Sequence, residues 1–142
     1  MTTHSTRTIL LTTLVIAVAQ MTIPPLTGMW SFALAWLWLA AVVLVFGAHA
    51  AVVGAGIVGA LLVELATGLA MGSTVAGFIA AAGFYRVAAR FIAIRPLADR
   101  QSMERSSLVA NILMGCVLAV IIPSVAAVFE AGVWGDVRRW RV

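Results

Sequence analysis

The feature that most constrains this chain is an apolar stretch from Met29 to Ala82, in which only His49 and Glu64 carry ionisable side chains. A single helix of that length would measure about 80 Å at 1.5 Å per residue, far more than the roughly 30 Å of a bilayer core. The stretch must therefore fold back on itself.

Glycine-containing breaks and prolines divide the chain into helices. Breaks at Gly47–Ala50 and Thr67–Thr74 interrupt the long stretch, and Ser73 is positioned to cap the helix after the second break. An earlier apolar segment, which we interpret as a retained first membrane helix rather than a signal peptide, stops at Pro24–Pro25, because proline cannot donate the helical hydrogen bond. Pro123 is expected to kink the end of the last span. The predicted membrane spans are 8–23, 29–46, 50–67, 73–93 and 106–128.

The composition supports a membrane class. Of 142 residues, 63% are hydrophobic and only 10% are charged, whereas soluble domains are about half apolar and a quarter charged. We predict an all-α, polytopic helical membrane protein forming a single domain over residues 1–142. It should have about five transmembrane helices and an amphipathic C-terminal segment at the interface, with Trp134 and Trp140 at headgroup depth.

All nine basic residues are arginines, and their positions predict the topology. Arginines at the ends of spans set orientation and contact lipid phosphates, so we expect no nucleic-acid partner. An arginine-rich fourth connection predicts a cytoplasmic loop and, with five spans, a cytoplasmic N-terminus in the inner membrane. The C-terminal arginines then lie outside, against the same rule, unless a sixth, re-entrant pass returns the tail to the cytoplasm. The arginines in or beside the fourth connection are Arg86, Arg90, Arg95, Arg100 and Arg105.

Glu64 is the acidic residue inside the apolar stretch. Steps of four place it on one helix face with Gly56, Ala60 and Gly68, whereas Leu62 and Val63 fall on a bulkier side. Small residues allow close helix approach in lipid. We therefore expect this stripe, with Gly72, to make helix or partner contacts.

Three roles for Glu64 remain open. Its carboxylate accepts hydrogen bonds from amides of the turn at residues 68–73, or pairs with an arginine or a partner subunit, or handles protons or ions. The first is favoured, because no span contains a second acidic residue.

No catalytic constellation, cofactor motif or metal-ligand cluster is evident. Cys116 is the single cysteine, and His4 and His49 do not suggest a metal pair. We expect a non-enzymatic protein without a cofactor.

The stretch GIVGALLVELATGLAMGSTVAGFIAAAGFYRVAARF resembles the MreD family of bacterial rod-shape-determining membrane proteins. That family shows a glycine-rich span, an acidic residue (more often Asp), a glycine turn and then a helix ending near aromatic and basic residues. AQMTIPPL resembles the family's first-span end, and the resemblance covers most of residues 8 to 93. The matching positions are Gly59, Glu64, Gly68, Gly72 and Tyr85.

The resemblance implies a non-enzymatic subunit of the cell-wall elongation machinery that acts through helix-mediated contacts. It would bind an MreC-like scaffold and, through it, the cell-wall synthases. The family is similar in fold to the substrate-binding subunits of energy-coupling-factor transporters, so a small-molecule-binding transport subunit is an alternative. An accessory subunit of another membrane complex is a third.

Overall fold

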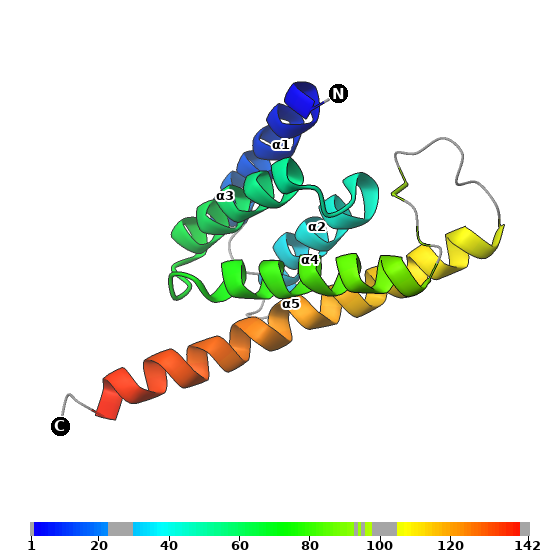
Figure 1. The fold of residues 1–142 in the computed structure, drawn as a ribbon. Coiled ribbons are helices and arrows are strands. Elements are labelled where there is room, and N and C mark those ends of the chain that lie inside the picture. The colour runs from blue at the N-terminus through cyan, green and yellow to red at the C-terminus, as the bar shows by residue number, and fades with distance from the viewer. Residues whose placement is uncertain (1, 23–29, 93, 95, 98–104, 140–142) are drawn as a thin grey trace.

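The computed structural model describes residues 2–22, 30–92, 94, 96–97 and 105–139 (Figure 1). Over these residues the chain is helical and contains no strand, which confirms the all-α class. Successive helices run in alternating directions, with α3 beside α1 and α5 beside α4. The helices are α1 (Thr2–Thr22), α2 (Trp30–Phe46), α3 (Ala50–Thr67), α4 (Ser73–Phe91) and α5 (Arg105–Arg139).

Both predicted breaks lie where the sequence placed them. Gly47 follows α2 with φ of 76°, and Gly68 and Gly72 delimit the α3–α4 turn with φ of 68° and 92°. These left-handed conformations are strained for residues with a Cβ atom, which explains why glycine occupies the breaks.

Two helices are long and apolar enough to cross a membrane among the residues that the structure describes. Their windows are Ala50–Thr67 in α3 and Leu108–Gly132 in α5. Thr6–Val18 and Leu34–Phe46 are shorter apolar segments of α1 and α2. Helix length and composition thus support two of the five expected spans.

The C-terminal part of the chain differs from the prediction. Instead of ending near residue 128 before a separate interfacial segment, α5 continues through Pro123 to Arg139 and extends past the other helices (Figure 1). One proline removes a single intrahelical donor, and the turns on either side keep the helix intact. Trp134 lies in this extension, but its side chain is outside the described part. Trp140, Arg95 and Arg100 also lie outside the described residues.

The main core lies between α2, α3, α4 and α5. Phe78, Leu118, Ile122 and Val43 are completely buried there. A smaller cluster around Ile9 joins α1 to α2 and α3. The bundle is therefore packed through its interior, although many large apolar side chains remain on its outer surface.

Small residues set the closest helix approaches. A Cβ atom at Gly56 of α3 would overlap the ring of Phe78 in α4, and one at Gly77 of α4 would overlap the backbone carbonyl of Ile122 in α5. Ala60 is fully buried beside Gly56 on α3. Gly56 and Ala60 are thus at a helix interface, as the small-residue stripe predicted.

Candidate functional site

The candidate site is the α3–α4 turn, which is built around Glu64. The backbone carbonyl of Glu64 accepts a hydrogen bond from the amide of Gly68 at 2.9 Å, and this bond closes the last turn of α3. With Gly68 left-handed, the geometry is the glycine-terminated αL motif that commonly ends helices. The main chain of Glu64 therefore terminates α3.

The side chain of the same residue starts α4. Oε2 accepts a hydrogen bond from the amide of Gly72 at 2.8 Å, and Oε1 accepts bonds from the amides of Thr74 at 2.6 Å and Val75 at 3.1 Å. The predicted hydrogen bonding of Glu64 to the turn is confirmed. The amides that donate to it continue to Val75 in the first turn of α4, two residues beyond the expected limit at residue 73.

Each amide at the start of α4 has an acceptor. The amide of Ser73 donates to the carbonyl of Ala70 at 3.1 Å, and the amide of Ala76 donates to the carbonyl of Gly72 at 2.9 Å. Glu64 accepts from the two amides between them. The first amides of a helix have no intrahelical acceptor, so a distant carboxylate performs here the function of an N-cap side chain.

Ser73 is not the N-cap that the sequence suggested. The N-cap is Gly72, and the Ser73 hydroxyl donates instead to the carbonyl of Ala70 at 2.9 Å. The Glu64 carboxylate occupies the position that a capping hydroxyl would need. A charged acceptor at a helix N-terminus is also stabilised by the helix dipole. The Glu64 carboxylate is therefore a stronger capping group here than the Ser73 hydroxyl would be.

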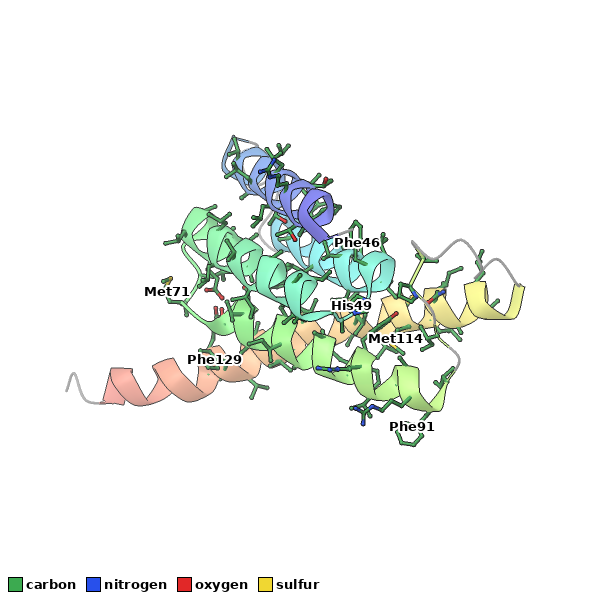
Figure 2. The ribbon with its side chains drawn as sticks, turned by 45° about the horizontal axis from the view of Figure 1, so that its top comes forward. Phe46, His49, Met71, Phe91, Met114 and Phe129 are labelled. Atoms are coloured by element: carbon green, nitrogen blue, oxygen red, sulfur yellow. The ribbon has the colours of Figure 1, made fainter. Side chains whose placement is uncertain are left out.

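The carboxylate is enclosed by protein. Glu64 is 1% exposed, and Thr74 and Ser73 beside it are completely buried. Phe129 of α5 lies against the turn, where a Cβ atom at Gly72 would stand 3.5 Å from its ring. In Figure 2 the turn lies between Met71, at its outer side, and Phe129. The α5 helix thus helps to cover the site.

No basic side chain of the described residues pairs with this carboxylate, whose partners are the amides given above. The described residues also contain no group of three His, Cys, Asp or Glu side chains able to hold a metal ion. A carboxylate has about four acceptor positions, and three are occupied here by amides. The arrangement favours a structural anchor over an ion-handling group.

One expectation about the small-residue stripe is wrong. Gly68 is exposed, with nothing within 4 Å of a Cβ atom built there, so it terminates the helix and does not pack against another one. Val63, on the bulkier side of α3, is also buried, with 1% of its surface exposed. The interface of α3 is wider than a single stripe, because α3 contacts α1, α2 and α4 together.

The remaining predicted residues lie apart from the turn. Arg86 and Arg90 are exposed near the end of α4, and Tyr85, directly before Arg86 in the sequence, is buried. Arg105 is the first residue of α5, and its side chain is outside the described part. Gly59 packs against Thr13 of α1.

A second polar contact was missed by sequence reasoning. The indole nitrogen of Trp38 donates to the Thr13 hydroxyl at 2.8 Å, and that hydroxyl donates to the carbonyl of Ile9 at 2.7 Å. Thr13 is completely buried, and Gly59 makes room for it. This contact joins α1, α2 and α3. A threonine at the centre of an apolar helix was the available signal, because it must find a partner when buried.

Comparisons with protein-family models, curated proteins and solved structures found no match.

Proposed function

We propose that this protein is a multi-pass subunit of a bacterial inner-membrane complex, and that it acts through helix-mediated contacts without catalysing a reaction. The observation that carries the proposal is the apolar outer surface. Large hydrophobic side chains are exposed on all five helices, including Val15, Leu37, Leu65 and Phe91 at 53% or more. Soluble monomers rarely expose continuous apolar surface of this kind. In a membrane the same surface contacts apolar lipid tails and is not exposed to water.

The lengths of the other three helices are compatible with spans in this proposal. α1, α2 and α4 have 21, 17 and 19 residues, or about 32, 26 and 29 Å at 1.5 Å per residue. Spanning helices need about 17 to 25 residues. Each of these three helices has the length required, although the apolar segments of α1 and α2, Thr6–Val18 and Leu34–Phe46, are shorter.

The alternating helix directions support the proposed topology. They bring the start of α1 and the end of α4 to the same end of the bundle (Figure 1). The arginine-rich connection after α4 and the N-terminus then face the cytoplasm together, as the positive-inside rule requires.

Labelling from outside intact cells tests this orientation. Cys116 is exposed on α5 and must first be replaced by alanine. A cysteine then placed at Ala98 should be protected from a membrane-impermeant reagent, whereas ready labelling would invert the topology.

The cellular role follows from the resemblance to the MreD family. In that role the subunit would bind an MreC-like scaffold and, through it, the cell-wall synthases. The buried carboxylate of Glu64 supports a structural over a transport role, because its hydrogen bonds are made within its own helical hairpin.

Depletion in the native bacterium tests the role. Loss of the protein should round or widen the cells and release the scaffold from the complex that co-purifies in mild detergent. Normal cell shape together with a co-purified small molecule would favour the transport-subunit alternative, and normal shape with unrelated partners would favour an accessory subunit of another complex.

A further inference from the structure

The last two turns of α4 carry two arginines that have no counter-charge among the described residues. Arg86 and Arg90 are both exposed, and they lie one helical turn apart, about 6 Å along the axis. Within the described part of the chain, neither guanidinium forms an ion pair. Two cations so close to each other repel, so an anion that contacts both would be stabilised.

Exposed apolar side chains lie directly beside these arginines. Phe84, Val87 and Phe91 are 44%, 56% and 84% exposed. At 100° per residue they fall on one flank of the exposed surface, and the arginines fall on the other. Figure 2 shows the Phe91 side chain directed away from the bundle. These five residues form what we call the arginine–aromatic face.

Between the two flanks the helix surface is open. Gly83 lies on the line that separates them, one turn before Val87, and nothing comes within 4 Å of a Cβ atom built at Gly83. The face thus combines two charged groups, an open helix surface and adjacent aromatic rings.

From this arrangement we infer that the arginine–aromatic face binds the phosphate headgroup of an anionic phospholipid, an inference that rests on the proposed membrane location. Guanidinium groups bind phosphate oxygens in bidentate geometry. Aromatic side chains are favoured at the level of the headgroups, where one end of the lipid is polar and the other apolar. An acidic protein segment would satisfy Arg86 and Arg90 but would leave Phe91 in water, whereas a phospholipid covers both flanks.

The test is a lipid titration of the purified full-length protein in mild detergent. Phosphatidylglycerol and phosphatidylcholine are added separately, and bound lipid is counted by native mass spectrometry. The double variant Arg86→Gln/Arg90→Gln keeps side-chain length and hydrogen bonding but removes both charges. Arg7→Gln is the matched control, because Arg7 is an exposed arginine near the start of α1.

Wild type and Arg7→Gln should bind phosphatidylglycerol with equal affinity, and the double variant should bind it about thirtyfold more weakly. That factor corresponds to about 1 kcal/mol for each basic residue near an anionic surface. Phe91→Ser should weaken binding of both lipids, because it removes the contact with the acyl region.

Equal phosphatidylglycerol affinity in wild type and the double variant would overturn the inference. So would binding of inorganic phosphate as tight as that of the lipid, since the aromatic flank would then have no function. Release of a co-purified acidic protein by the double variant, with lipid affinity unchanged, would assign the face to a protein partner. Recovery of the native protein in the aqueous fraction without detergent, measured beforehand, would instead overturn the proposed membrane function.

Discussion

Replacing Glu64 tests the central feature of the fold. Glu64→Leu removes the acceptor of three amides at the start of α4, those of Gly72, Thr74 and Val75. Glu64→Gln retains one oxygen. Oε1 and Oε2 each accept bonds in the wild type. In the glutamine variant one of them is replaced by an NH2 group, which must then face a backbone N–H, and two donors cannot form a hydrogen bond. The best arrangement keeps the Thr74 and Val75 bonds and loses the bond from Gly72.

The magnitudes follow from the number of amides affected. A buried amide left without an acceptor costs about 1–3 kcal/mol, so three cost about 3–9 kcal/mol. Removing a buried carboxylate recovers about 3 kcal/mol on insertion scales. Glu64→Leu should therefore destabilise the protein by about 3 kcal/mol, the middle of the resulting range. At about 4 °C per kcal/mol for a chain of this size, its Tm falls by about 12 °C. Glu64→Gln loses one amide bond, at about 1–3 kcal/mol, and recovers part of the cost of burying a charge, so its Tm should fall by less than that of Glu64→Leu.

Thermal unfolding in detergent, followed by the fluorescence of the five tryptophans, provides the assay. Glu130 of α5 is the matched control, because it is a half-buried glutamate for which the structure records no hydrogen bond or ion pair. Glu130→Gln and Glu130→Leu should leave the Tm within about 2 °C of wild type, as for substitutions away from specific contacts. A Glu64→Leu protein as stable as wild type would refute the capping account. Equal falls in Tm for the two Glu64 variants would show that stability depends on the negative charge and not on the number of acceptor oxygens.

Three further substitutions test the helix contacts. Gly56→Leu should lower the Tm in detergent by about 4–12 °C, because the new side chain overlaps the ring of Phe78, whereas Gly54→Ala, which points into open space, should not destabilise. Gly77→Ala should be comparably destabilising, because the added methyl meets the backbone of α5, which cannot move out of the way as a side chain can; an unchanged Tm would contradict the close approach of α4 and α5. Thr13→Val keeps the shape but removes the acceptor of the indole that reaches it from α2, and should cost about 1–3 kcal/mol in urea or thermal unfolding; a neutral result would show that this bond does not stabilise the three-helix contact.

The sequence was sufficient for the parts of the fold that depend on local chemistry. The breaks at Gly47 and at residues 68–72 follow from glycine's access to positive φ, and the position of Glu64 near one of them predicted its hydrogen bonds. The contact between Gly77 and Ile122 was not predictable, because periodicity shows which residues share a face but not which face meets which helix. The continuation of α5 through Pro123 was missed for a related reason. A proline ends an isolated helix more readily than one packed along its length.

The position of Glu64 explains why the apolar stretch from Met29 to Ala82 contains a carboxylate. The first amides of α4 have no intrahelical acceptor, and at this turn they are enclosed by protein, so a side chain must accept their hydrogen bonds. A serine or threonine at the N-cap accepts one such bond, but the N-cap here is glycine, because the backbone needs φ of 92° at Gly72. A carboxylate eight residues earlier, one turn before the end of α3, reaches three amides at once. The same residue ends α3 through its carbonyl, so one residue both ends the first helix of the hairpin and caps the second. A shorter aspartate at position 64 would have one methylene less with which to reach the three amides. We therefore expect Glu64→Asp to retain fewer of these bonds and to have a Tm between those of wild type and Glu64→Leu.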